Sequence, residues 1–70
     1  MSIKKCEVTA ILVNYFSSAY SIEAVKSIFS TSGFSSIKVV VVDNSCDKNE
    51  ENVLASGLPE SAELIVNSKN

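Results

Sequence analysis

The chain has 70 residues, among them no histidine and only two glycines. Without histidine, it cannot form a Ser/His or a Cys/His nucleophile pair. The glycines, Gly33 and Gly57, are also absent from the segment NYFSSAYS that follows the first apolar run. Glycines at that place let a pyrophosphate approach a helix N-terminus. These absences exclude triad catalysis, the dinucleotide-binding fingerprint and a Walker A loop, so a phosphate, if bound, must be held in another way.

Clustered positive charge and long apolar runs are missing as well. Six basic residues are scattered among eight acidic ones, for a net charge of −2, which argues against nucleic acid as a partner. No apolar stretch approaches the ~18 residues that span a bilayer. The start MSIKKCEVT lacks the apolar centre of a signal peptide. We therefore expect a cytoplasmic protein without a membrane span.

The residues that are present indicate a small α/β fold. Hydrophobic residues make up 46% and charged residues 20% of the chain, a composition far from that of disordered proteins. Two β-branched apolar runs bounded by polar clusters, Val8–Asn14 and Ile37–Asp43, predict strands. Residues 62–66 predict a weaker third strand.

The segment between the first two strands predicts an amphipathic helix over residues 21–32. Its apolar side chains share one helical face: Ile22, Val25, Ile28 and Phe29. Gly33 follows where a helix commonly ends. The chain's three phenylalanines, Phe16, Phe29 and Phe34, are expected in the core rather than in a site.

A second, shorter helix is predicted between the second and third strands. Asp47 followed three residues later by Glu50 resembles a capping box. Val53 and Leu54 supply a short apolar stripe, and Gly57 marks the end of the helix. The whole pattern is βαβαβ.

Strands that alternate with helices predict a three-stranded parallel sheet with right-handed crossovers. The order 3-2-1 places both helices on one face and leaves the other uncovered, whereas 2-1-3 places one helix on each face. Yet the unbroken apolar runs at residues 11–13 and 39–42 are typical of strands covered on both faces. With the order 3-2-1, which we favour, we expect either a piece of a larger sheet or copies that pair through the uncovered face or an edge.

The residues that follow the strands are candidates for a binding site, because open α/β sheets bind ligands at the carboxyl ends of their strands. These residues are Asn14, Tyr15, Asp43, Asn44, Ser45 and Asn67. The Asp43 carboxylate only accepts hydrogen bonds, so it favours a base that offers N–H groups: uracil and thymine offer one imide N–H, and guanine offers two donors. Alternatively, Asp43 simply organises a turn with Asn44 and Ser45.

At these residues the chain resembles the family 2 inverting glycosyltransferases with the GT-A fold, in particular the rhamnosyltransferase-like bacterial enzymes of cell-surface polysaccharide assembly. The similar segments are TAILVNYFS, VVVVDNSC, SGLP and LIVNSKN. The resemblance implies that Val13, Asn14 and Tyr15 line a nucleoside pocket, and that Asp43 accepts from the imide N–H of uracil or thymine. Asn44 and Asn67 are expected beside them as nucleotide-binding residues.

The resemblance also implies what these 70 residues lack. A complete enzyme of this family uses Mg²⁺ or Mn²⁺ on the leaving diphosphate and a carboxylate base on the acceptor, and neither motif is present. We expect residues 1–70 to form a single partial domain, the N-terminal half of a Rossmann-like GT-A domain. On its own it would bind a UDP- or dTDP-sugar weakly, hold no cofactor or metal, and transfer no sugar.

Two other hypotheses remain. One is a small α/β interaction or dimerisation module without catalysis, which uses the uncovered sheet face or an edge to form a homodimer. The other is a receiver-like phosphoacceptor at Asp43, but such a protein would carry acidic partners after the first strand, where this chain has Asn14 and Tyr15.

Overall fold

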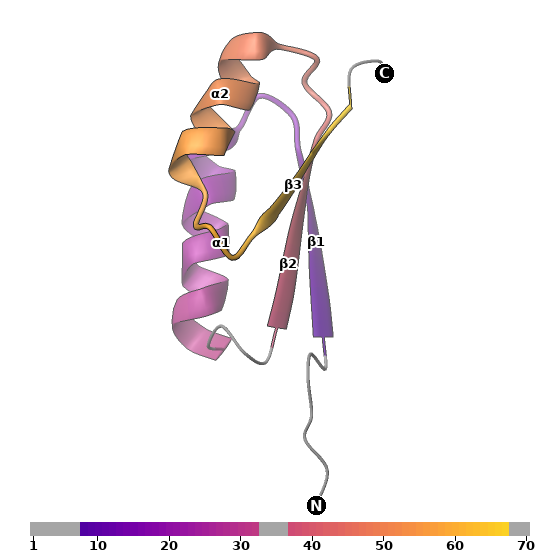
Figure 1. Cartoon of the computed structure of the whole chain (residues 1–70). Helices are drawn as coiled ribbons and strands as arrows, with labels where there is room; N and C mark the ends of the chain where they lie inside the picture. The colour runs from indigo at the N-terminus through magenta and orange to yellow at the C-terminus, as the bar shows by residue number, and fades with distance from the viewer. Residues whose placement is uncertain (1–7, 33–36, 68–70) are drawn as a thin grey trace, which may run out of the picture.

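A computed structural model describes residues 8–32 and 37–67 of the chain. Its elements follow one another in this order: β1 (Val8–Asn14), α1 (Ser18–Ser32), β2 (Ile37–Asp43), α2 (Lys48–Gly57) and β3 (Glu63–Val66). Figure 1 shows the strands side by side with both helices next to them. The predicted α/β class and the alternation of strands and helices are confirmed.

The sheet is parallel throughout, and β2 lies between β1 and β3. Asn14 at the end of β1 is paired with Asp43 at the end of β2, and Asp43 with Val66 of β3. This is the 3-2-1 order that we favoured, so the 2-1-3 alternative is wrong. Because the strands end in register, the segments that follow them start at the same edge of the sheet. We call it the carboxyl edge.

The predicted bounds of β1 and β2 are confirmed, and β3 begins at Glu63. The first helix begins earlier than predicted, at Ser18. The Ser17 carbonyl already accepts a hydrogen bond from the Ser21 amide at 2.9 Å, which closes the first helical turn. Gly33, the expected end of this helix, lies outside the described residues.

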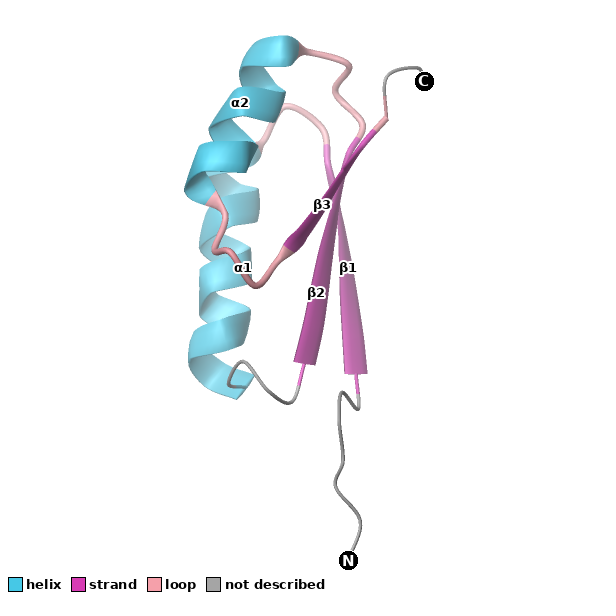
Figure 2. Ribbon diagram, in the orientation of Figure 1, coloured by secondary structure: helices cyan, strands magenta, loops and turns pink. Residues whose placement is uncertain are grey.

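Both helices pack on the same face of the sheet (Figure 2). The side chains buried there come from α1, β2 and α2: Val25, Phe29, Val39, Val41 and Leu54. The predicted core position of Phe29 is confirmed. Val53 was expected to face the core beside Leu54, but it is 47% exposed. Neighbouring residues on a helix point about 100° apart, so the narrow contact of α2 buries only one of the pair.

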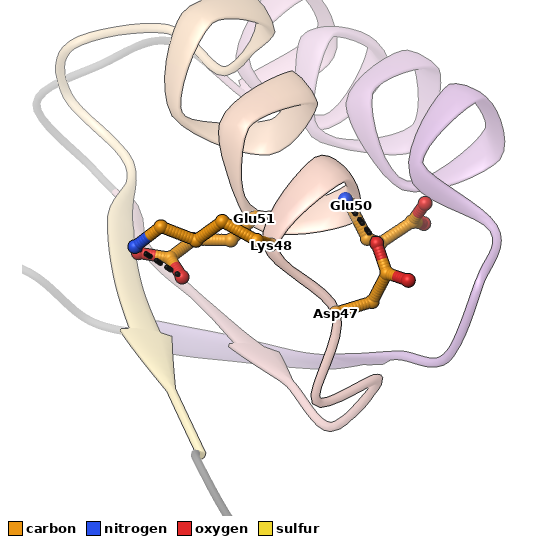
Figure 3. Close-up of polar contacts among 4 residues, drawn as sticks. All are labelled: Asp47, Lys48, Glu50 and Glu51. Carbon is orange, nitrogen blue, oxygen red and sulfur yellow. Dashed lines mark hydrogen bonds and ion pairs between the residues drawn. The ribbon is translucent and has the colours of Figure 1, made fainter.

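The second helix begins with the predicted cap at Asp47. The Asp47 side chain accepts a hydrogen bond from the Glu50 amide at 3.0 Å (Figure 3). The helix ends at Gly57, after which the Leu58 amide donates to the Leu54 carbonyl at 2.9 Å. Neither α1 nor α2 is long and apolar enough to cross a membrane.

The opposite face of the sheet carries apolar side chains that no described segment covers. Ile11 and Val13 are 66% and 65% exposed, and Ile65 is also exposed. Val40 and Val42, from the same face of β2, are half-buried. Successive strand residues point to opposite faces, so the valine run of β2 supplies both the core and this surface. We call these five residues the open face, and their exposure confirms the uncovered face predicted for the 3-2-1 order.

Candidate functional site

The carboxyl edge is held together by backbone hydrogen bonds that continue beyond the strands. The Asn44 amide donates to the Asn14 carbonyl at 2.8 Å, and the Asn67 amide donates to the Asp43 carbonyl at 2.9 Å. The first residues after β2 and β3 are therefore fixed against the ends of neighbouring strands. This backbone brings most of the predicted site residues together.

Asp43 points into the covered side of the sheet and is fully buried. Its Oδ1 atom accepts from the Asn14 side-chain amide at 3.1 Å and from the Ser45 backbone amide at 3.2 Å. Its Oδ2 atom is buried but accepts no hydrogen bond from any described residue. A buried polar atom without a partner is costly and uncommon in folded proteins. Oδ1 thus has two protein donors, whereas Oδ2 has none among the described residues; we call Oδ2 the open oxygen.

Asn14 is also fully buried, and its side chain is the centre of a polar network. Its Nδ2 atom lies near three acceptors: Asp43 Oδ1 at 3.1 Å, Glu50 Oε2 at 3.2 Å and Ser45 Oγ at 3.4 Å. Its Oδ1 atom accepts from the Ser21 hydroxyl at 2.6 Å. One side chain therefore connects β1 with α1, β2, the loop after β2, and α2.

Glu50 differs from the capping box that the sequence indicated. In a full capping box its carboxylate would return to the Asp47 amide. Instead, Glu50 Oε2 accepts from the Ser18 amide at 2.8 Å, in the first turn of α1. In Figure 3 the Glu50 carboxylate extends toward the ribbon of α1, and no dashed line joins it to Asp47. The first turn of α1 has no acidic residue of its own, so Glu50 supplies the negative charge that a helix N-terminus favours.

Two residues in the loops at this edge have left-handed backbone conformations. Phe16, after β1, has φ of 51°, and Cys46, after β2, has φ of 56°. Such angles are unfavourable for residues other than glycine and occur often at functional sites. The Phe16 amide donates to the Ser45 hydroxyl at 2.8 Å, which joins the two loops.

Aromatic side chains stand exposed beside the network. Tyr15 and Phe16 are 63% and 53% exposed, and their rings meet edge to face with centroids 5.0 Å apart. The expectation that Phe16 lies in the core is wrong, because its left-handed backbone and its hydrogen bond to Ser45 hold it in the loop. Phe34 lies outside the described residues.

The remaining predicted site residues lie around this network. Asn44 Oδ1 accepts from Asn67 Nδ2 at 2.8 Å, so these two amides form the outer rim of the edge. Val13 belongs to the open face, on the side of the sheet opposite to the buried Asn14 side chain. The structure therefore groups Asn14, Asp43, Asn44 and Asn67 and leaves the Val13 side chain apart. Tyr15 follows Asn14 in the chain, and its exposed ring contacts Phe16.

Ser21 and Glu50 were not among the candidate site residues predicted from the sequence. Ser21 is buried one helical turn before Val25, and a hydroxyl on the apolar face of a helix is a signal that could have found it. Glu50 was interpreted as part of a capping box within its own helix, so its contact with the Ser18 amide was not expected.

The described residues do not suit a metal ion. No three His, Cys, Asp or Glu side chains converge among them, and they enclose no pocket. The Asp43 and Glu50 carboxylates meet only through the Asn14 amide. We therefore derive no step that involves Mg²⁺ or Mn²⁺ from these residues.

Comparison of the chain with protein-family models, with curated proteins and with solved structures gives no match.

Proposed function

We propose that this chain is a nucleoside-binding segment of a glycosyltransferase that uses a UDP- or dTDP-sugar. The observation that supports the proposal best is the buried Oδ2 atom of Asp43, which accepts no hydrogen bond from the described residues. The atom lies at the carboxyl edge of a parallel sheet, where open α/β folds bind their ligands. A hydrogen-bond donor from a ligand would satisfy it.

The state of the two Asp43 oxygens favours a pyrimidine imide as that donor. Oδ1 already accepts from Asn14 and Ser45, which leaves one oxygen for the ligand. The single N3–H of uracil or thymine fits one open acceptor, whereas guanine presents two donors side by side. Cytosine carries an acceptor at N3, and its lone pair would face the carboxylate.

The neighbouring residues would complete the recognition of the nucleoside. Tyr15 offers an exposed ring that can pack against a base. Asn44 and Asn67 bring two amides to the rim, while Val13 would take part through its backbone alone. Because Asp43 is buried, the base reaches Oδ2 only after the loops after β1 and β2 shift, and the left-handed Phe16 and Cys46 lie in these loops.

Nucleotide titration followed by backbone amide NMR shifts tests this proposal. We expect UDP and dTDP to shift the amides near Tyr15 and Asp43, and CDP to leave them in place. Asp43→Asn should abolish the response. The one oxygen of its amide is needed by Asn14 and Ser45, so an NH2 donor would stand where Oδ2 accepts. Glu60→Gln is the matched control, since it removes an exposed carboxylate in the turn that leads into β3. An equal response to CDP, or no response to any nucleotide, would contradict the proposal.

The proposal concerns nucleotide recognition and not sugar transfer by these residues alone. The isolated chain should release no sugar when incubated with UDP- or dTDP-sugars, Mn²⁺ or Mg²⁺ and an acceptor alcohol. Turnover that survives purification, and that Asp43→Asn removes, would show that the residues do more than we propose.

The open face favours a second candidate, a module that associates with another copy of itself. Exposed contiguous apolar surface on a small protein commonly marks an interface, and Ile11 and Val13 are both about two-thirds exposed. Sedimentation velocity over a range of concentrations tests this candidate. A dimer that Ile11→Asp returns to the monomer, together with the absence of any nucleotide response, would favour it over the first.

A further inference from the structure

The Asn14 side chain is buried beneath the carboxyl edge, so it is not placed to contact a nucleotide directly. It is fully buried within the network, and both ends of its amide have partners: Nδ2 donates to Asp43 and Glu50, and Oδ1 accepts from Ser21. An incoming base would meet Asp43 Oδ2, whereas Asn14 lies on the Oδ1 side of the carboxylate. Asn14 is therefore placed to act through Asp43 rather than on the ligand.

The amide of Asn14 is shared between two carboxylates. Asp43 Oδ1 and Glu50 Oε2 both lie within 3.2 Å of Nδ2. An amide has two N–H groups, so each carboxylate can receive one of them. Because carboxylates only accept, they orient the NH2 end of the amide toward themselves. The Ser21 hydroxyl donates to the oxygen at the other end at 2.6 Å.

We infer that Asn14 is a positioning residue that keeps Asp43 Oδ1 occupied and Oδ2 open for a nucleobase imide. The inference rests on the proposed function. Without the Asn14 donor, Asp43 would keep only the Ser45 amide on Oδ1 and could rotate. Oδ2 would then no longer be held in one orientation toward the base. Glu50 extends the effect, because it receives the second N–H of Asn14 and the first-turn amide of α1 at Ser18.

Replacing Asn14 by aspartate separates positioning from a general structural role. Asn14→Asp conserves the shape of the side chain but turns the donor into an acceptor. The titratable groups that face it are Asp43 from β2 and Glu50 from α2. The other neighbours are hydroxyls, from Ser21 of α1, from Ser17 before it and from Ser45 after β2. Two facing carboxylates favour the protonated form of the introduced group. When protonated, it can donate to Asp43 Oδ1 as the amide does.

The experiment compares uridine binding by the full chain at about pH 5 and about pH 7.5, two values above the ordinary range of an aspartate. For Asn14→Asp, we expect affinity at least about tenfold weaker at the higher pH, the loss of roughly one charge-assisted hydrogen bond. The original chain should bind equally at both. Asn52→Asp introduces the same charge at an exposed position of α2 and is the control.

The outcomes distinguish this inference from the proposed function. If the original chain does not bind uridine, the proposed function fails. If it binds, and Asn14→Asp binds equally at both pH values, the inference alone is overturned. Should Asn14→Asp not fold at the higher pH, Ser21→Ala decides, since it frees the far end of the amide. We expect Ser21→Ala to weaken binding at both pH values, and unchanged affinity would overturn the inference.

Discussion

The two faces of the sheet each carry residues of an unexpected kind, polar ones at the carboxyl edge of the otherwise apolar covered face and apolar ones on the open face. Beneath the helices, Asn14 and Asp43 are polar and fully buried. On the open face, Ile11 and Val13 are apolar and about two-thirds exposed. A buried polar residue and an exposed apolar patch are the informative departures in a small protein. The covered face thus holds a polar network at its carboxyl edge, and the open face is a surface that is suited to a further covering layer.

The largest expected effect comes from placing a charge on each face in turn. Val41→Asp buries a carboxylate in the core, which costs more than the ~3 to 5 kcal/mol that a core of this size supplies. We expect it to abolish cooperative unfolding in urea, followed by circular dichroism. Ile11→Asp should cost about 1 kcal/mol or less, because the side chain is already exposed. If Ile11→Asp also unfolds the chain, the open face is covered in solution.

A smaller effect is expected from two adjacent positions of α2. Leu54 is fully buried and Val53 is 47% exposed. Leu54→Ala should cost about 3 kcal/mol, because it leaves a cavity under the helix. Val53→Ala should change the free energy of unfolding by about 0.5 kcal/mol or less. Urea titrations of both variants check the pair, and equal losses would show that α2 packs on a broader contact than the structure has.

The polar network can be tested in the same way at Glu50 and Glu51. Glu50→Ala removes the acceptor of the Ser18 amide and one partner of Asn14, so we expect a loss of about 1 to 2 kcal/mol. The Glu51 carboxylate forms an ion pair with the exposed Lys48 at 3.5 Å (Figure 3) and makes no other side-chain hydrogen bond or ion pair with the described residues. Glu51→Ala should therefore cost about 0.5 kcal/mol or less. Thermal unfolding measures both, and a larger loss at Glu51 would contradict the network.

Local patterns in the sequence were sufficient to predict most of the fold. The β-branched runs of β1 and β2 are bounded by polar residues, so both ends of each strand were predicted correctly. The start of α1 was not, because residues 18–20 carry no apolar stripe. This start depends on Ser17 and on Glu50, which is 32 residues away from Ser18 in the chain. A contact at that separation leaves no periodic signal.

The candidate site was predictable to the extent that strand ends define it. In-register parallel strands bring Asn14 and Asp43 together, and the topology alone led to both residues. Neighbouring strand residues point to opposite faces, so the alternation places the Val13 side chain on the face opposite to Asn14. The resemblance had instead grouped the two residues in one pocket. The open oxygen of Asp43 was not predictable, because it depends on which donors the folded loops bring to Oδ1.

The smallest expected effect lies where the two helices meet on the covered face. Gly57 of α2 lies so close to Ile22 of α1 that a Cβ atom there would collide with Ile22 Cδ1. Alanine gains about 1 kcal/mol in helix propensity over glycine, and a shift of the flexible Ile22 side chain costs a similar amount. We therefore expect Gly57→Ala to change stability little. In an Ile22→Val background, which removes Cδ1, the same substitution should stabilise the chain by about 0.5 to 1 kcal/mol. A double-mutant cycle by urea unfolding measures this coupling, and equal effects in both backgrounds would show that the helices are further apart.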